Sequence, residues 1–580
     1  MNAETVGDVE DLEGVFGNPT CEQGSFTHDT IVRADIDRGI VNSAALQLDE
    51  WGFAAEFVPV SRGGRWASTE DLVRRLLPIF RRDPSLGLGH GITSLMGAAN
   101  VWVAGDEDMQ SRVAKRLLAG ERIAVGFHEL SHGNDLIENE CMAVRVTEPT
   151  AGWRVDGRKE VINNIDRAES VLLFVRTDPE SGPRGFSLLL WHKDETRPGR
   201  VDTSRRLLTS GMRGCLIGAV EIDGLVLPAE SLVGDRGAGV MTALRAFQIT
   251  RSVIPALAAG IVDAAIRLSV GYARDRSLYG ASVWDLPHAR TLVVRAWAAL
   301  LVADSFARAV VRTLHLRPDE TFLASAASKY LVPLLLNGAM EDLSTLFGSN
   351  FYAISPPYGI FEKWLRDLVV VPIGHAGSTS CLLTLIPNLP TWARRSRRDN
   401  PYDPRLFSTD SDFDQVDFGT IGVSAGRVDS LTAPLRSEIV LATFRAEHPT
   451  LVVMIDAWAR ELDLVRDDAL ALPISELGSD ASVAAFDIAK RLTAVMAAGS
   501  VLGTWFEGRS TSTSPFSDGD VAITAALDHL SSLLRPRTAE ESRTYNSRAR
   551  TQVSIDAAAA HLLTCVDTKT SLGTEELPVA

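Results

Sequence analysis

An arginine and a group of glycines are the first residues whose types suit the binding of a phosphate. Arg276 closes the helical-looking segment YARDR, and an arginine that projects from a helix can hold a pyrophosphate through its planar guanidinium. The same side chain could instead pair with an acidic residue one helical turn away, and the sequence leaves both interpretations open. The glycines of residues 234–240 could cradle a phosphate, although such glycines more often serve a tight entry into a helix.

One stretch of the chain has no carboxylate. Residues 368–393 contain no Asp or Glu, in a chain that has 74 of them. The stretch contains His375, whose neutral imidazole, with a reference pKa of about 6.5, can accept a proton near pH 7. Taken by itself, His375 is expected to be a loop histidine bonded to a nearby carbonyl.

Composition limits the class of protein. The 580 residues exceed one typical domain of roughly 100–200 residues. The net charge of −16 argues against a nucleic-acid binder, which needs a basic surface. The five cysteines are scattered and show no CxxC spacing, so we expect neither a zinc site nor a disulfide framework. The start of the chain lacks signal-peptide features and residues 368–393 are too polar to span a membrane, so a cytoplasmic protein is predicted.

Hydrophobic periodicity divides the chain into helical and β regions. Apolar residues recur at helical spacing before residue 122 and again after residue 235, whereas short β-branched segments separated by Gly, Pro, Asp and Asn lie between them. An α+β fold with a central antiparallel β-domain and a helix bundle is predicted. The predicted regions are a flexible acidic tail at 1–27, an N-terminal helical domain at 28–121, a β-domain at 122–235, a four-helix bundle at 236–395, a linker at 396–419 and an extra C-terminal helical domain at 420–580.

This order of regions, together with six segments, resembles the acyl-CoA dehydrogenase family of flavoproteins. GERIAVGFHELSHGNDL resembles the segment whose core is T-E-P-x-A-G-S-D, and DGRKEVINNIDRA resembles G-x-K-x-W-I-T-N. SGMRG, VLPAESLVGDRGAGVMTAL, YARDRSLYG and FEKWLRD resemble four further family segments in the same order. The resemblance covers roughly residues 28–395.

The resemblance implies that FAD binds between the β-domain and the bundle, with its ADP end at a neighbouring subunit. The positions that match the family's substrate contacts are Asn134, Gln248, Arg251 and Gly374. The positions that match its cofactor contacts are Phe127, His128, Asn134, Val161, Asn163, Arg276, Tyr279, Gly348, Ser349 and Gly377. No metal is implied.

The same resemblance implies desaturation of an acyl thioester, in which a carboxylate removes the α-proton and the β-hydrogen goes to the flavin as hydride. The usual Glu position is His375 in this chain, and the Tyr before it is Gly374. A minority of family members place the base one residue before a family-typical Arg, which here is Thr250 before Arg251. Since neither position holds a carboxylate, His375 is the candidate base, with Thr250 and Arg251 as further catalytic candidates.

The divergent pocket leaves other functions open. Val161 replaces a Trp expected beside the flavin, and Asn134 replaces a Ser expected at the thioester carrier. We therefore expect an acyl thioester in specialised metabolism, bound to CoA or to an acyl carrier protein, with an unknown electron acceptor. The alternatives are a flavin monooxygenase on the same fold and a base-less, inactive partner subunit or scaffold. The C-terminal extension resembles the extra domain of the longer family members and predicts a homodimer.

Overall fold

The computed structural model divides the chain into two compact units. It describes residues 11–21, 24–147, 151–195, 199–354, 356–374, 376–396, 401–409, 412–509, 514–516, 520–534, 552–570 and 572–573. The N-terminal unit consists of Met1–Thr250 together with Asp414–Val423, and the bundle unit consists of Arg251–Phe413 together with Ser424–Ala580.

Helices open the N-terminal unit, and they begin at polar caps as the sequence leads one to expect. Thr27 forms a capping box with Thr30, and the side chains of Ser68 and Asp106 accept hydrogen bonds from the first turns of α4 and α7. The helices are α1 (Leu12–Phe16), α2 (His28–Ile36), α3 (Asn42–Trp51), α4 (Thr69–Arg82), α5 (Pro84–Gly87), α6 (Thr93–Ala104) and α7 (Glu107–Leu118).

The flexible tail predicted for residues 1–27 is wrong for its described part. Residues 12–16 form α1, and the side chain of Leu12 is 1% exposed. Glu13 is buried beside two arginines of α4, 3.1 Å from Arg81 and 2.7 Å from Arg82. An acidic composition predicts a solvated segment, whereas this carboxylate compensates buried guanidinium groups.

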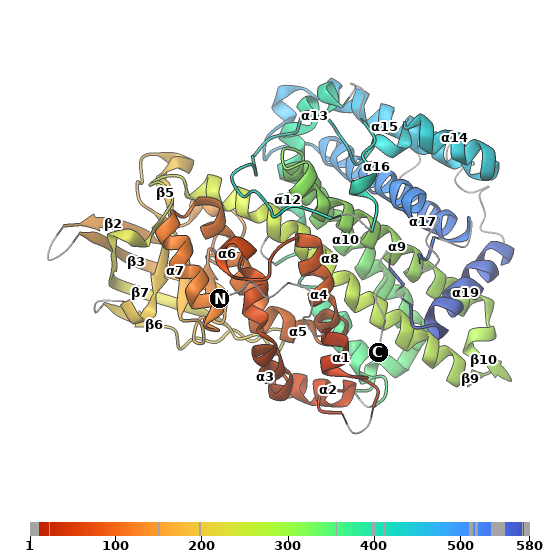
Figure 1. Ribbon diagram of the computed structural model, residues 1–580, viewed down its shortest axis with the longest axis horizontal. Helices are drawn as coiled ribbons and strands as arrows, with labels where there is room; N and C mark the ends of the chain where they lie inside the picture. The colour runs from red at the N-terminus through yellow and green to blue at the C-terminus, as the bar shows by residue number, and fades with distance from the viewer. Residues whose placement is uncertain are drawn as a thin grey trace. The chain divides into compact units, whose positions relative to one another are not determined.

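A mixed sheet forms the rest of this unit. Its strands are β1 (Ile123–Gly126), β2 (Met142–Val146), β3 (Gly152–Asn163), β4 (Ser170–Arg176), β5 (Phe186–His192), β6 (Arg200–Asp202), β7 (Ile217–Pro228) and β8 (Leu232–Val233). They lie in the order β6-β7-β3-β2-β4-β5-β8, with β1 paired to β4. Figure 1 labels β2, β3, β5, β6 and β7 of this sheet. Most pairs are antiparallel as predicted, but β1 and β2 both run parallel to β4. A core of aliphatic side chains with Trp153 and Trp191 covers one region of this sheet.

Long helices dominate the bundle unit. They are α8 (Gly239–Asp275), whose first twelve residues belong to the N-terminal unit, α9 (Pro287–Leu316) and α10 (Thr321–Phe347). The short strands β9 (Ser277–Leu278) and β10 (Ala281–Ser282) form a hairpin, and α11 (Gly359–Leu368), α12 (Ser378–Leu385) and α13 (Leu389–Arg395) follow α10. Helix α8 is long and apolar enough to cross a membrane, but 78% of its most apolar window is buried, as in a core helix.

The C-terminal extension packs directly on these helices. It contains α14 (Glu438–Glu447), α15 (Pro449–Ala471), α16 (Val483–Gly508), α17 (Val521–Ser531) and α19 (Gln552–Asp567). Helix α16 contacts both α9 and α10, and α17 and α19 contact α9 (Figure 1). Part of the predicted linker is also packed, since Leu406 and Phe407 are buried. The extension is therefore part of the bundle unit's core rather than an appended domain.

Buried carboxyl groups join the bundle to its extension. Glu320, at the start of α10, accepts hydrogen bonds from the amide and hydroxyl of Ser430 at 2.7 and 2.8 Å. Asp429 accepts from the indole of Trp392 at 2.9 Å. Burial raises the pKa of Glu320 to about 8, and nearby Asp429 adds to that increase.

We expect Glu320→Gln to reduce the pH dependence of stability. The folded-state pKa of about 8 lies above the ordinary glutamate pKa of 4.5, so the folded state keeps a proton that the unfolded chain releases in this interval. The free energy of unfolding of the wild type should therefore fall as pH rises from 4.5 to 8, and the variant should lose much of this slope. Urea denaturation at a series of pH values measures it, with exposed Glu438→Gln as control. Equal slopes for the wild type and Glu320→Gln would contradict the assignment.

Candidate functional site

The end of β1 carries the first two residues matched to cofactor contacts. The ring of Phe127 is 1% exposed and packs against Phe174 and Phe247, with centroids 5.5 and 5.9 Å away. Its carbonyl oxygen accepts a hydrogen bond from Asn139 at 2.7 Å. Phe127 therefore supports the strand end from within the core, and the next residue is the one that presents a polar side chain.

His128 offers a proton acceptor. Its Nδ1 lies 3.1 Å from the carbonyl oxygen of Gly133, and since a carbonyl only accepts, Nδ1 carries the proton. Nε2 then holds a lone pair, and it has no hydrogen-bond partner among the residues that the structure describes. Burial lowers the pKa of His128, the Gly133 carbonyl partly opposes this, and Lys159 lowers it further. The ring is neutral near pH 7.

A buried ion pair fixes the loop that follows. Lys159 of β3 is 0% exposed and donates to Glu129 at 2.8 Å. Glu129 also accepts from the amides of Glu140 and Cys141 at 2.8 and 3.1 Å. Burial raises the pKa of Glu129, but Lys159 and these hydrogen bonds outweigh it and hold the pKa below its usual value. Both ends of the loop 129–141 are thus tied to the sheet.

The end of β3 is irregular at the next matched positions. Val161 has φ +56° and its side chain is 42% exposed, where the register of β3 against β7 shifts. A β-branched residue in the left-handed region is strained, and such strain persists where the surrounding structure imposes it. The side-chain amide nitrogen of Asn163 donates to the carbonyl oxygen of Leu88 at 2.9 Å, which fixes the orientation of the side-chain amide. Its Oδ1 is buried and has no donor within the described part of the chain.

The hairpin after α8 presents the predicted phosphate ligand. Tyr279 and Gly280 both have positive φ, as two-residue hairpin turns require, and Tyr279 is 95% exposed. Arg276 is exposed and forms no ion pair with a described residue, whereas Arg274 pairs with Asp567 at 2.7 Å. Asp567 lies on α19, so the ion pair of Arg274 is not the pair one helical turn away that was the alternative for Arg276.

Three buried polar side chains of the bundle unit, one of them the predicted catalytic residue Arg251, come from α8, α10 and α12. Arg251 is 2% exposed, Lys329 of α10 is 1% exposed and Cys381 of α12 is 0% exposed. Burial lowers the pKa of Lys329 to about 8, an effect that the Cys381 thiol opposes and Arg251 strengthens. Lys329 donates to the carbonyl oxygen of Val371, so α10 holds the segment that leads to Gly374.

The other matched positions differ in their surroundings, and one of them lies outside the described residues. Asn134 and Ser349 are exposed, and Gly348, with φ +53°, ends α10. Gly377 precedes α12 and accepts from the amide of Cys381. His375 lies outside the described residues. In the N-terminal unit, Thr250 is 1% exposed and donates to the carbonyl oxygen of Phe247 at 3.2 Å, so its hydroxyl is part of the helix interior.

The side chain of Gln248 is hydrogen-bonded to another segment of the chain. It is 0% exposed, and its amide donates to the carbonyl oxygen of Gly422 at 2.7 Å. Gly422 belongs to Asp414–Val423, hereafter the strap, which joins the N-terminal unit although its flanking residues belong to the other. The predicted contact of Gln248 with a substrate therefore requires a group that the strap already uses.

Sequence reasoning missed the lysines and the strap. The chain has seven lysines, and Lys159, Lys329 and Lys363 are all at most 2% exposed. The chain uses lysine rarely, with seven lysines against 51 arginines. A lysine at a buried position of such a chain therefore indicates that a compact ammonium is needed there. The strap had no such signal, because its polar, Asp-rich sequence is typical of a solvated linker.

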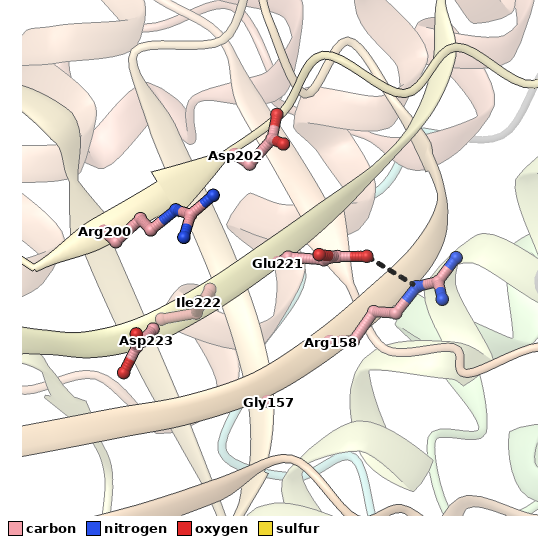
Figure 2. A pocket seen from close by; sticks show the side chains of 7 residues that line it. All are labelled: Gly157, Arg158, Arg200, Asp202, Glu221, Ile222 and Asp223. Carbon is pink, nitrogen blue, oxygen red and sulfur yellow. Dashed lines mark ion pairs between the residues drawn. The ribbon is translucent and has the colours of Figure 1, made fainter.

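A separate hollow of about 390 Å³ lies on the sheet (Figure 2). Charged side chains of both signs surround it, and Arg158 lies 3.8 Å from Glu221. None of the residues matched to the cofactor or the substrate lines it. The lining residues are Gly157, Arg158, Arg200, Asp202, Glu221, Ile222 and Asp223.

Comparison with known proteins finds similarity over part of the chain. Residues 237–387 match the family model described as "Acyl-CoA dehydrogenase, C-terminal domain". "Probable acyl-CoA dehydrogenase FadE25" of Mycobacterium tuberculosis is 26% identical over 335 residues, which are 57% of this chain and 82% of that protein. The chain is therefore similar to proteins of the acyl-CoA dehydrogenase superfamily.

Solved structures of the superfamily show how much of the chain shares the fold. An acyl-CoA dehydrogenase of Bacillus anthracis, complexed with FAD, has a TM-score of 0.65 at 16% identity and covers 97% of this chain and 99% of its own. The prolyl acyl carrier protein oxidase AnaB has a TM-score of 0.51 at 17% identity and covers 60% of this chain and 91% of its own. The predicted fold class, with its extra C-terminal helices, is confirmed.

We expect Lys159→Met to destabilise the N-terminal unit by about 3–5 kcal/mol, because it leaves the Glu129 carboxylate buried without its cation. Arg154→Met, which breaks an exposed pair with Asp156 on the same strand, should cost about 1 kcal/mol or less. Urea denaturation followed by tryptophan fluorescence compares the two variants. Similar losses for both would contradict the structural role of the Lys159–Glu129 pair.

Proposed function

We propose that this protein is an FAD-dependent oxidoreductase that oxidises an acyl thioester, by α,β-dehydrogenation or a related reaction. Its similarity to acyl-CoA dehydrogenases supports the reaction class. The observation that carries the proposal is the end of β3, where a strained Val161 and an orphaned acceptor on Asn163 lie at the positions matched to cofactor contacts. A folded chain retains such features where a ligand uses them.

The residues present fit FAD. Asn163 offers a buried acceptor and His128 offers Nε2, and both suit the donors and polar edge of a flavin ring. In the bundle unit, exposed Arg276 lacks an ion pair among the described residues and suits a pyrophosphate, and exposed Tyr279 suits a planar ring. The Bacillus anthracis structure, similar over nearly the whole chain, is complexed with FAD.

When bound, FAD supplies the two-electron oxidation. The chain must then bind and orient the thioester, exclude water and accept a proton. His375 remains the proposed base, and Lys329 positions the segment that precedes it through the carbonyl of Val371. Arg251 is buried and interacts electrostatically with Cys381 of α12, the helix that follows Gly377.

The proposed substrate is an acyl group on a carrier in specialised metabolism, handled by a cytoplasmic homodimer. The similarity to AnaB, a prolyl acyl carrier protein oxidase, supports a carrier-bound substrate. All five cysteines are free, which supports a reducing compartment.

We expect Arg276→Ala to weaken FAD binding about ten- to a hundredfold, because a charge-assisted contact with phosphate is lost. Arg274→Ala is the matched control, since it removes another exposed charge of the same segment, one that pairs with Asp567. Flavin absorbance after gel filtration and titration of the apoprotein measure the effect. Equal losses in both variants would contradict a phosphate role, and a wild type that stays colourless with added FAD would support an inactive subunit.

We expect His375→Ala to lower the rate of flavin reduction by about 10²–10⁴-fold, the usual contribution of a general base. The probes are a panel of acyl-CoA and acyl-pantetheine thioesters under anaerobic conditions, with dithionite reduction to confirm intact flavin. His288→Ala, an exposed histidine at the start of α9, is the control. Unchanged reduction would exclude His375 as the base. Turnover that needs oxygen and a reductase would instead support the monooxygenase.

A further inference from the structure

Three neighbouring strands, β3, β7 and β6, build the hollow of about 390 Å³ on the sheet (Figure 2). Arg200 of β6 lies opposite Asp223 of β7, and Asp202 lies opposite Glu221. On the other side of β7, Arg158 of β3 also lies opposite Glu221. Because directly opposed and alternate residues share a face of a sheet, these five side chains project from the same face. The strand register therefore gathers two arginines and three carboxylates around one hollow.

The charges of this hollow do not neutralise one another. Arg200 and Asp223 are exposed and of opposite sign, yet neither forms an ion pair or a side-chain hydrogen bond with a described residue. The terminal nitrogen of Arg158 donates to Glu160 at 2.6 Å, whereas its Nε atom is buried and lacks a hydrogen-bond partner in the part of the chain that the structure describes. Glu221 lies 3.8 Å from this Nε, beyond hydrogen-bond distance. A buried donor of this kind points to a partner that the chain itself does not supply.

Two carboxylates also meet in the hollow. Asp202 lies directly opposite Glu221, and like charges at such positions destabilise a sheet. Hydrogen bonds from Ser204, one of them from its amide at 2.9 Å, lower the pKa of Asp202 and keep the carboxylate ionised near pH 7. Among the described residues, no group of three or more His, Cys, Asp and Glu side chains is arranged to hold a metal ion. The cation that suits this pair is therefore an organic one.

We propose that this hollow is an additional binding site, for a small zwitterion that carries an ammonium and a carboxylate group, as an amino acid does. The ammonium binds between Asp202 and Glu221. The carboxylate takes the free donors of Arg200, since a guanidinium can hold both carboxylate oxygens. None of the residues matched to the cofactor or the thioester lines the hollow, so this ligand is separate from both and its binding does not depend on the proposed function.

The strand spacing and the size of the hollow limit the length of the ligand. Arg200 and Asp202 are two residues apart on β6, so their Cα atoms are about 6–7 Å apart. A ligand that reaches both side chains needs only a short chain between its two charges. The volume of about 390 Å³ lies near the lower end of the usual range for small-molecule pockets, roughly 300–1,000 Å³. The hollow therefore favours an amino acid with few carbons between its charges.

Glycine, β-alanine, γ-aminobutyrate and 5-aminovalerate are the probes, because they carry the same two charges at increasing separation. Their binding to the purified full chain is measured by saturation-transfer NMR at low ionic strength. We expect at least one of them to bind. The amine and the carboxylic acid of the same carbon number, which carry one charge each, should bind at least about tenfold more weakly, because each lacks one of the two charge-assisted contacts.

Substitutions in the hollow locate the site. Arg200→Ala and Asp202→Asn should each weaken binding of the best probe about tenfold, because each removes a charge-assisted contact at one end of the ligand. Arg200→Lys keeps the positive charge and should retain part of the affinity. Arg145→Ala, which removes an exposed arginine of β2 that does not line the hollow, is the control and should leave the affinity unchanged.

Absence of binding by all four amino acids overturns the proposal, as does equal binding of the compounds with a single charge. Binding that Arg200→Ala and Asp202→Asn leave intact lies elsewhere on the chain and also overturns it. A loss that Arg145→Ala reproduces does the same, since the effect would then follow from net charge. The measurement needs neither flavin nor turnover, so its outcome is independent of whether the protein oxidises a thioester.

Discussion

Compensation of buried charge is the constraint on which this structure depends. An ammonium or carboxylate removed from water is tolerated when a partner of opposite charge and good geometry replaces the solvent. Lys159 and Glu129 meet this condition at 2.8 Å, and the loop that begins with His128 is held by them. Glu13 does the same for two arginines of α4 and thereby draws the start of the chain into the core. These pairs hold irregular segments to regular ones, which is what a site built from loops requires.

The same constraint distinguishes the bundle unit from the usual catalytic arrangement. A carboxylate is absent from the sequence between residues 368 and 393, and the buried side chains that surround this segment include Arg251 and Lys329. Burial brings the pKa of Lys329 down to about 8, near the range where proton transfer occurs at neutral pH.

The strap is a segment with the composition of a linker that nevertheless packs against the N-terminal unit. Its Asp-rich sequence resembles a solvated connection, and several of its side chains are exposed. The strap is held through its own backbone carbonyl oxygens, which accept hydrogen bonds from the side chains of Arg245 and Gln248 on α8. Because backbone carbonyls are present in every sequence, hydrogen bonding of this kind leaves no mark in composition. The consequence is that a polar linker covers a position at which relatives are expected to meet substrate.

Helical spacing, β-branched runs and the order of six segments determined the architecture of this chain from its sequence alone, because each depends on residues close to one another. The same information identified the acid-free stretch around His375 and the exposed Arg276. Tertiary structure decided the rest. The left-handed Val161, the orientation of Asn163 and the Lys159–Glu129 pair arise where separate strands meet. Gln248 of α8 and Gly422 of the strap are 174 positions apart in the sequence. Contacts over such separations depend on packing that no local pattern encodes.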